Sequence, residues 1–330
     1  MSKLKLGIIG SNFVSDWLCE AARLTDDFTL RAVYSRTAEK GSDFAAKHGI
    51  DTVYTDLEEF LSSDIDAVYI ASPNCMHAPQ TIAAVRHGKH VLCEKPTAST
   101  HRELCEMFRE ADKSGVVLLE AMRPAFDPAL AAVRDTLPRI GKVRRASFEF
   151  CQYSSRYDKF RAGEVLQAFK SEFSNAAVMD IGVYPIHFCL RLFGSPSEDI
   201  FSKSVMLENG FEGSGEILMP YEGFTAVISY AKTFDSVTPS FISGEDGSIL
   251  IDKMSAPRKI TYIPRKGEAE DIPFDLRENN MVFELSEFAR LIRLGCPDLD
   301  HRRFSLAEAE ILDRVRAMNG IVFPADHASL

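Results

Sequence analysis

Short apolar segments alternate with amphipathic stretches through the first 123 residues, and this alternation limits the possible fold more than any other feature. Apolar residues recur at helical spacing between the segments, as at Val14, Trp17 and Ala21. Glycines 49, 88 and 115 stand where such helices would end. The strand candidates are residues 4–9, 30–34, 52–54, 67–71, 90–93 and 116–120. Six strands that alternate with helices predict a doubly wound, parallel nucleotide-binding sheet for residues 1–123.

The pattern changes near Pro124. A helix is expected over residues 127–137, because Asp127 can cap it and Pro128 suits its first position. Strands then dominate, and two helices follow at about 279–294 and 305–319. The strand candidates are residues 143–153, 202–207, 214–219, 225–232, 240–243, 249–252 and 259–263. We therefore predict an α+β domain over residues 124–330, with a large, mostly antiparallel open sheet and helices on one face.

Composition narrows the class of protein. A length of 330 residues, 45% of them hydrophobic, suits two domains with full cores. The formal net charge of −10 argues against nucleic acid as a partner, since phosphate binding needs a basic face. No 18-residue apolar stretch and no apolar signal segment is evident, and the seven cysteines include no Cys-x-x-Cys pair. The sequence predicts a cytoplasmic protein with no membrane partner and no metal motif.

A charged tripeptide, Glu94-Lys95-Pro96, ends the apolar run 90–93. In open α/β sheets, ligands bind outside the carboxyl ends of the strands. A lysine there can transfer protons and polarise a carbonyl group, so Lys95 is a candidate catalytic residue. The alternative is a surface Glu-Lys pair before a turn-forming proline.

The turn after the first strand candidate stands where a dinucleotide fingerprint must lie. In the pattern G-x-G-x-x-G/A, Gly10 matches the first glycine, Asn12 replaces the second and Ser15 replaces the third. Asparagine tolerates a left-handed backbone better than most residues, and serine is small enough for close packing. The alternative is an ordinary strand–helix turn. The residues predicted to face the cofactor here are Gly10, Ser11, Asn12, Phe13 and Val14.

The end of the second strand candidate indicates which cofactor binds. An NAD site usually places Asp or Glu there to bond the ribose hydroxyls. This chain has Ser35, Arg36 and Thr37, with Lys40 nearby, which suit a 2′-phosphate. Thr37 could also cap a helix while Arg36 lies exposed, and both interpretations can hold together. We predict NADP(H) as the preferred cofactor, with NAD(H) possible.

Two further strand ends carry candidate residues. The turn after the fourth strand lies where a dinucleotide would pass toward its nicotinamide, although it is also an ordinary turn sequence. Its predicted cofactor-facing residues are Ala71, Ser72, Pro73, Asn74 and His77, and Glu94 and Lys95 join them from the end of the fifth strand. His77 could equally begin a helix without any chemical role. Arg123, after the sixth strand, could hold a polar substrate group or pair with Glu94 or Glu120.

A third set of candidates lies in the second half of the chain. Asp180 and Tyr184 are four residues apart, which places them on one face of a helix, and His187 could join that face. A carboxylate, a phenol and an imidazole together suit proton transfer to a carbonyl group. The alternative is a capping Asp180 with Tyr184 and His187 as core residues.

Taken in chain order, these motifs resemble the Gfo/Idh/MocA family, the glucose–fructose oxidoreductase and inositol dehydrogenase group. The resemblance covers essentially the whole chain. It rests on the N-terminal fingerprint, on Ser72-Pro73-Asn74, on Glu94-Lys95-Pro96, on Glu120-Ala121 and on Asp180-x-Gly-x-Tyr184. Asn12 departs from the family's glycine-rich turn.

The resemblance implies a Rossmann domain joined to a domain with a broad open sheet, through which a homodimer or homotetramer could form. It implies NAD(P)-dependent oxidation or reduction of sugars, cyclitols, dihydrodiols and related polyhydroxy or diol substrates. By position, Lys95 matches the lysine that orients the substrate and manages its proton. Asp180 matches the substrate-side aspartate, and Tyr184 stands where many members have histidine. Tyrosine there is similar to the dihydrodiol and sugar dehydrogenase branch.

Our hypothesis is reversible hydride transfer between nicotinamide and a carbinol or carbonyl carbon. Tyr184 or Lys95 would carry the proton, Asp180 would bond a neighbouring hydroxyl, and Arg123 and His187 would contact the substrate. Two alternatives stay open. One is a non-catalytic, dinucleotide-sensing regulator of the same fold, and the other is a reductase of a non-sugar carbonyl compound such as a tetrapyrrole.

Overall fold

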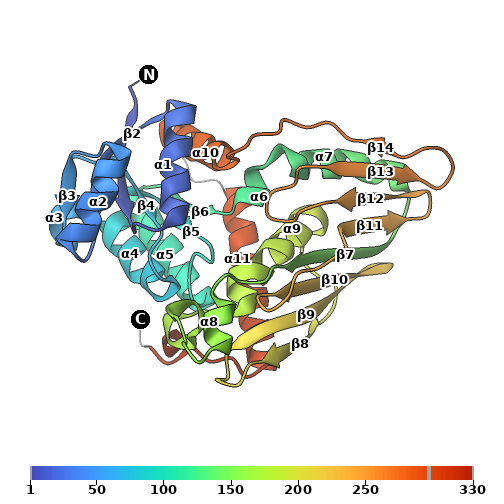
Figure 1. The fold of residues 1–330 in the computed structure, drawn as a ribbon. Coiled ribbons are helices and arrows are strands. Elements are labelled where there is room, and N and C mark those ends of the chain that lie inside the picture. The colour runs from blue at the N-terminus through green and yellow to red at the C-terminus, as the bar shows by residue number, and fades with distance from the viewer. Residues whose placement is uncertain (1, 296–298, 329–330) are drawn as a thin grey trace. The chain divides into compact units, whose positions relative to one another are not determined.

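The computed structural model describes residues 2–295 and 299–328, and these residues form two compact units. Unit 1 contains the residues up to Met122 together with Glu278–Leu306. Unit 2 contains Arg123–Arg277 and the residues from Ala307 onward (Figure 1). Each unit is built around one sheet.

The sheet of unit 1 has six strands in the order β3-β2-β1-β4-β5-β6, and all neighbours pair in parallel. The order reverses between β1 and β4, which is the switch point where such sheets bind their ligands. All four residues of β4 are buried, as expected for a strand covered on both faces. The strands are β1 (Leu4–Ile9), β2 (Phe28–Tyr34), β3 (Thr52–Tyr54), β4 (Ala67–Ile70), β5 (His90–Glu94) and β6 (Leu118–Ala121).

Helices follow the strands of unit 1 as the sequence predicts. Gly49 and Gly115 end α2 and α5 in left-handed conformations, which glycine adopts without a steric penalty. Thr100 caps the start of α5, because its Oγ1 accepts from the Glu103 amide, and the Glu103 carboxylate accepts from the Ser99 amide just before the helix. The helices are α1 (Phe13–Thr25), α2 (Ala38–His48), α3 (Leu57–Leu61), η1 (Asn74–Met76), α4 (His77–Arg86) and α5 (His101–Ser114).

A helix from late in the chain completes unit 1. α10 (Met281–Leu294) packs against α1, and the Phe288 ring stacks on Phe28 at a centroid distance of 6.0 Å. The Asn279 side chain donates to the Trp17 carbonyl at 2.9 Å. The sequence predicts this helix but gives no sign that it packs with the first half of the chain.

The sheet of unit 2 has eight strands in the order β14-β13-β12-β11-β7-β10-β9-β8. β7 and β10 pair in parallel, and the other neighbours pair antiparallel. Figure 1 shows these strands side by side as one broad sheet. They are β7 (Val143–Cys151), β8 (Phe201–Met206), β9 (Glu212–Tyr221), β10 (Phe224–Ala231), β11 (Ser240–Gly244), β12 (Gly247–Ile251), β13 (Ile260–Pro264) and β14 (Glu270–Asp271). The sequence missed β14, which has only two residues.

Helices cover one face of this sheet. α9 packs on β7 and β10, and α7 packs on β13. The side chains that point toward α9, such as Phe148 and Ile228, are fully buried. The elements are α6 (Arg123–Phe126), α7 (Pro128–Thr136), η2 (Leu137–Ile140), α8 (Tyr157–Arg161), η3 (Gln167–Phe169), η4 (Ser171–Phe173), the π-helical η5 (Val178–Gly182), α9 (Val183–Phe193), α11 (Leu299–Met318) and η6 (Pro324–Asp326). The predicted fold class is confirmed.

One helical stretch, Ser171–Phe193, has the length and composition to cross a membrane. About 72% of its most apolar window is buried within the fold, as in the core helix of a soluble protein. The absence of a membrane partner stays a prediction.

Candidate active site

The turn between β1 and α1 requires glycine at its first position. Gly10 has φ +101°, a conformation that L-residues with side chains rarely adopt. A Cβ atom on Gly10 would also lie 2.5 Å from the Ala71 carbonyl oxygen at the end of β4. The positive φ of Gly10 matches the role of the first fingerprint glycine, which makes the tight turn.

Asn12 stabilises the same turn, but not for the reason predicted. Its φ of −99° and ψ of 177° are extended, so the expectation of a left-handed Asn12 is wrong. Asn12 instead caps α1, since its Oδ1 accepts from the amides of Val14 at 2.9 Å and Ser15 at 3.2 Å. Its Nδ2 donates to the Ala71 carbonyl at 2.8 Å. Asn12, which replaces the second glycine, therefore links the turn after β1 to the end of β4. Ser15, which replaces the third glycine, is fully buried.

The residues after β2 lie at the surface. Arg36, Thr37 and Lys40 are exposed, and Thr37 stands at the N-cap of α2 without a side-chain capping bond. Gly41 lets α2 approach the sheet closely, because a Cβ there would lie 2.6 Å from Val53 Cγ1. The exposed guanidinium and hydroxyl can meet a phosphate group at the start of this helix.

His77 links the turns that follow β4 and β5. The ring is 1% exposed, with Nε2 2.9 Å from the Ser72 carbonyl and Nδ1 2.9 Å from the Pro96 carbonyl. Burial lowers the pKa of His77, although the bonds to the two carbonyls oppose this, and the Lys95 charge lowers it further. A neutral ring donates to one of the two carbonyls. His77 thus holds two predicted cofactor loops, and its direct contact with a cofactor stays a prediction.

Glu94 and Lys95 stand at the end of β5, and both are half-buried. Tyr69 on β4 donates its hydroxyl to Glu94 Oε1 at 2.6 Å, and the Lys95 amide lies 3.3 Å from Glu94 Oε2. The loop that follows is held by Glu120, which is 4% exposed and accepts from the Thr97 amide at 3.3 Å and from Ser305 Oγ at 2.6 Å. Lys95 therefore comes directly after Glu94, whose carboxylate is held by Tyr69 on the neighbouring strand.

In unit 2, Asp180 lies in the π-helical turn η5, directly before α9. Turns of this kind occur often at functional sites. The sequence predicts α-helical spacing from Asp180 to Tyr184. That prediction is wrong, because Asp180 lies in the π-helical turn and Tyr184 lies in α9. The Asp180 side chain is 41% exposed, whereas Tyr184 is 6% exposed and packs edge-on against Phe150. Gly182 lets the turn approach β10, because a Cβ there would lie 3.0 Å from the Tyr230 ring.

A buried carboxylate, Glu212, holds the start of η5. It is 1% exposed, accepts from the Val178 amide at 2.7 Å and from the Tyr230 hydroxyl at 2.8 Å, and also bonds Ser204. Burial raises the pKa of Glu212, and the bonds from Ser204, Val178 and Tyr230 oppose this rise. The sequence analysis missed Glu212, because a β-bulge between Val205 and Met206 shifts the register beside it.

A buried lysine, Lys232, pairs with Asp180 at 2.8 Å, and sequence reasoning missed this residue as well. The alternation of side chains along β10 could have indicated that Lys232 points inward, because Ala226, Ile228 and Tyr230 are all buried. The same alternation predicts an inward side chain at Lys232.

The other predicted substrate contacts also lie in unit 2. His187 Nδ1 is 2.6 Å from Glu308 Oε2, and both side chains are 2% exposed. Arg123 begins α6 and is half-buried. Contact of either residue with a substrate stays a prediction, as does the meeting of Lys95 with Asp180 and Tyr184.

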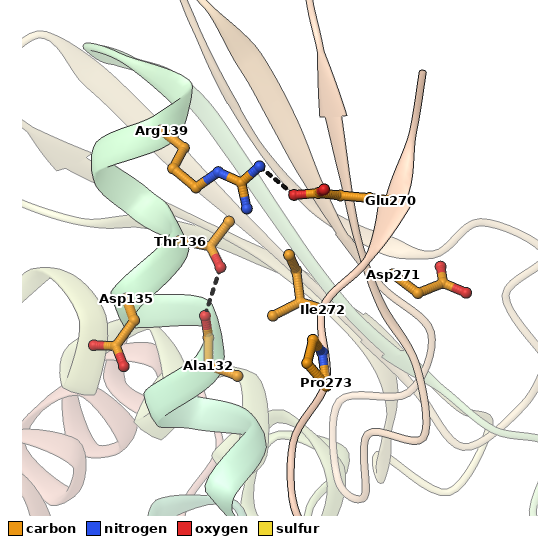
Figure 2. Close-up of a pocket in the computed structure, with 8 residues that line it drawn as sticks. All are labelled: Ala132, Asp135, Thr136, Arg139, Glu270, Asp271, Ile272 and Pro273. Carbon is orange, nitrogen blue, oxygen red and sulfur yellow. Dashed lines mark hydrogen bonds and ion pairs between the residues drawn. The ribbon is translucent and has the colours of Figure 1, made fainter. Parts of the chain in front are cut away.

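A cavity of about 360 Å³ in unit 2 contains none of the predicted site residues. It lies between α7, η2 and the segment that carries β14 (Figure 2). Figure 2 shows Arg139 reaching across to Glu270, with which it forms an ion pair, and Thr136 donates to the Ala132 carbonyl. Because these polar groups bond one another, we assign no function to this cavity.

Comparisons with known proteins agree with the geometry. Residues 4–122 match the model of an oxidoreductase family with an NAD-binding Rossmann fold. The scyllo-inositol 2-dehydrogenase (NADP(+)) IolU of Bacillus subtilis is 44% identical, and the match covers 98% of this chain and 100% of that protein. The human trans-1,2-dihydrobenzene-1,2-diol dehydrogenase is 28% identical, with 98% and 99% covered.

Solved structures share the fold. The 3-ketoreductase KijD10 from Actinomadura kijaniata, in complex with NADP and TDP-benzene, superposes with a TM-score of 0.85 at 21% identity, covering 98% of this chain and 99% of that one. An aldose-aldose oxidoreductase from Caulobacter crescentus superposes with a TM-score of 0.83 at 19% identity, covering 96% and 97%. The predicted family and enzyme class are confirmed: this chain belongs to the Gfo/Idh/MocA family of NAD(P)-dependent oxidoreductases.

Proposed function

We propose that this protein is an NADP(H)-dependent dehydrogenase or reductase that acts on a hydroxyl or carbonyl carbon of a cyclitol, sugar or dihydrodiol. One observation carries the proposal. The chain is 44% identical, over 98% of its length, to an NADP-dependent scyllo-inositol dehydrogenase. The dihydrodiol dehydrogenases, at 28% identity and less, support the wider substrate class.

The residues of unit 1 fit the dinucleotide. Gly10 forms the tight turn after β1, and the backbone amides at the start of α1, where Asn12 caps the helix, can bind a phosphate. Arg36 and Thr37 are exposed at the end of β2, where they can hold a 2′-phosphate. The loops after β4 and β5, joined by His77, would hold the nicotinamide end of the cofactor.

The proposed chemistry needs a group that handles a proton and a group that orients the substrate. When bound, the nicotinamide supplies the site that accepts or gives up a hydride. Lys95 or Tyr184 takes the hydroxyl proton in oxidation and returns it in reduction. Asp180 accepts a hydrogen bond from a neighbouring hydroxyl, and Arg123 and His187 contact the rest of the substrate.

The outward face of the unit 2 sheet supports assembly into a homodimer or homotetramer. The strand register places one row of side chains across this face, and we call it the outward row. It consists of Phe201, Leu218, Val227, Ser147, Phe241, Leu250 and Thr261. Phe201 and Leu218 are exposed by 64% and 42%. Arg145 and Glu149 flank the row on opposite sides, so a second copy related by a two-fold axis can complement both charges.

A cytoplasmic location is part of the same proposal. Cys19, Cys93 and Cys189 are buried and form no disulfides. Burial raises the pKa of Cys19 and of Cys189 to about 12, which keeps both as inert thiols.

The test combines cofactor binding with turnover. We expect the protein to bind NADPH more tightly than NADH in a fluorescence titration, and to reduce NADP⁺ with scyllo-inositol, another cyclitol, a sugar or a diol. Lys95→Met should lower kcat by roughly 10²–10⁴-fold, the usual contribution of a proton-transfer group, without loss of thermal stability. Lys266→Met, at an exposed lysine on a turn, is the control and should leave kcat unchanged.

Two results would contradict the proposal. Turnover by Lys95→Met at the normal rate would remove Lys95 from the mechanism. Tight NADPH binding with no turnover of any polyhydroxy or diol compound would favour the regulator without catalysis.

A further inference from the structure

Lys232 is a buried lysine directly after β10, and its surroundings set it apart from the surface lysines of unit 2. Its side chain is 4% exposed. Lysine is almost never buried without a partner, because taking an ammonium group out of water is costly. The Nζ atom lies 2.8 Å from Asp180 Oδ2 and donates to the Ala168 carbonyl at 3.1 Å.

Two aromatic rings enclose the same ammonium group. Nζ lies 5.0 Å from the centroid of Phe169 and 5.5 Å from that of Phe211. Both phenylalanines are buried, so they exclude water and place the negative faces of their rings near the cation. The backbone of Lys232 is fixed as well, because its amide donates to the Gly213 carbonyl and its carbonyl accepts from Ser154, each at 2.9 Å.

The ion pair is strongly asymmetric in exposure. Lys232 approaches the carboxylate from the interior, whereas the Asp180 side chain is 41% exposed. A lysine in this position cannot itself reach a substrate in solvent. It can hold one carboxylate oxygen while part of the Asp180 side chain stays accessible to solvent.

The geometry points to Lys232 as a positioning residue that fixes the Asp180 carboxylate in one orientation for a substrate hydroxyl. This inference rests on the proposed function, in which Asp180 contacts the substrate. The π-helical turn gives a reason for such a device. The turn departs from regular α-helical bonding. The ion pair with Lys232 adds an interaction from outside the helix, and this interaction defines where the Asp180 side chain points.

The test replaces Lys232 by methionine, which keeps the apolar stem and removes the charge. With NADP⁺ and scyllo-inositol, we expect Lys232→Met to lower kcat/KM by roughly tenfold to hundredfold, the usual cost of a misplaced catalytic geometry. NADPH affinity should stay within about twofold, because the proposed cofactor residues lie in unit 1. Lys259→Met, which breaks the exposed Lys259–Asp271 pair in the same unit, should change neither quantity.

A double-mutant cycle separates a positioning role from a purely structural one. If Lys232 acts through Asp180, the variant with both Asp180→Asn and Lys232→Met should turn over no more slowly than Asp180→Asn alone. Lys232→Arg, which retains the charge, should recover part of the loss. Independent, multiplicative losses, or normal turnover by Lys232→Met, would overturn the inference.

The cycle also separates this inference from the proposed function. If wild type turns over scyllo-inositol and Lys95→Met does not, the proposed function stands whatever Lys232→Met does. If wild type turns over no cyclitol, sugar or diol, the proposed function fails, and the positioning role fails with it. If Lys232→Met loses thermal stability and NADPH affinity together with turnover, its role is structural and the inference is wrong.

Discussion

The two sheets of this protein are covered differently, and the difference determines where each can bind another molecule. In unit 1, β4 is buried at every position and helices follow the strands on both faces. In unit 2, α9 covers one face of the sheet, and the outward row lies on the other. A sheet covered on both faces leaves only its strand ends for ligands, whereas a sheet covered on one face has a whole surface to offer.

The turns of the two units are also held in different ways. In unit 1, Asn12 and His77 bond backbone carbonyls at neighbouring strand ends, so the candidate cofactor loops are joined directly to one another. In unit 2, Glu212 and Lys232 hold the Asp180 turn from strands that lie more than 30 residues away in the chain. The first arrangement joins turns at the ends of neighbouring strands, and the second depends on the packing of a helical turn on a sheet.

The largest effect should come from placing one charge in each sheet. Val68→Asp puts a carboxylate at a fully buried position of β4, and we expect a loss of more than about 4 kcal/mol in the free energy of unfolding. Leu218→Asp, in the outward row, should change that free energy in the monomer by less than about 1 kcal/mol. Urea denaturation measures both.

The same pair of variants tests assembly. Leu218→Asp should shift the protein to smaller species in sedimentation velocity, because a charge in the outward row opposes its burial between copies. An unchanged oligomeric state in that variant would contradict assembly through this face. A stable Val68→Asp variant would contradict the contrast between the sheets.

A smaller effect is expected at the strand end of unit 1. Gly10→Ala should weaken NADPH binding by at least about tenfold, because strain at such a backbone position costs on the order of 1–3 kcal/mol and the new Cβ meets the Ala71 carbonyl. Gly49→Ala is the matched control, since Gly49 also has a positive φ but nothing lies within 4 Å of its Cβ position. Gly49→Ala should lower stability by about 1 kcal/mol and leave NADPH affinity unchanged. Equal NADPH affinities for the two variants would show that the Ala71 contact does not matter.

The smallest effect concerns His90 at the start of β5. Burial lowers its pKa from 6.5, although the Asp66 charge opposes this, and its Nδ1 accepts from the Val117 amide at 3.0 Å. The unfolded chain therefore binds the proton more readily, and this contribution to stability is present above pH 6.5 and is lost as the pH falls toward the lower folded pKa. His90→Gln should remove this contribution, so the free energy of unfolding should fall less steeply as the pH drops below 6.5. The contribution that is removed amounts to about 1.4 kcal/mol for each unit by which folding lowers the pKa.

The matched variant for this prediction is His327→Gln, at an exposed histidine near the end of the chain. A change in the pH dependence that both variants share would not come from the burial of His90. A profile that is unchanged in His90→Gln would show that burial does not lower the pKa of His90.

The fold was predictable to the extent that it depends on periodicity and on turn residues. β1 and β3 begin and end where the sequence predicts, because apolar runs bounded by turns define short buried strands. α7 follows from Asp127 and Pro128, and Asp127 does cap it by accepting from the Ala129 amide. The packing of α10 against α1 was not predictable, because a helical pattern shows that one face is buried but not against which partner.

In the candidate site, too, local motifs were predictable and the contacts of particular side chains were not. The turn at Gly10 and the strand end at Lys95 lie where the sequence predicts, because each follows a short apolar strand in a known sheet order, and their roles stay predictions. The cap by Asn12 was missed, since a gap in the glycine pattern hides a side chain that performs a different task. Glu212 was missed because the β-bulge beside it shifts the register, whereas the side-chain alternation of β10, in which Tyr230 is buried, also predicts an inward Lys232.

The return of residues 278–306 to unit 1 has a consequence for exchanging parts between relatives. A chimaera with a single junction near residue 123 would inherit α1 from one parent and α10 from the other, so Phe28 would have to stack on a foreign residue at position 288. The Arg293–Asp27 ion pair and the bond from Asn279 to Trp17 would be divided between the parents as well. Recombination that transfers the nucleotide-binding module intact therefore needs three crossover points, near residues 122, 277 and 306, and a library built with one would sample mostly mismatched helix pairs.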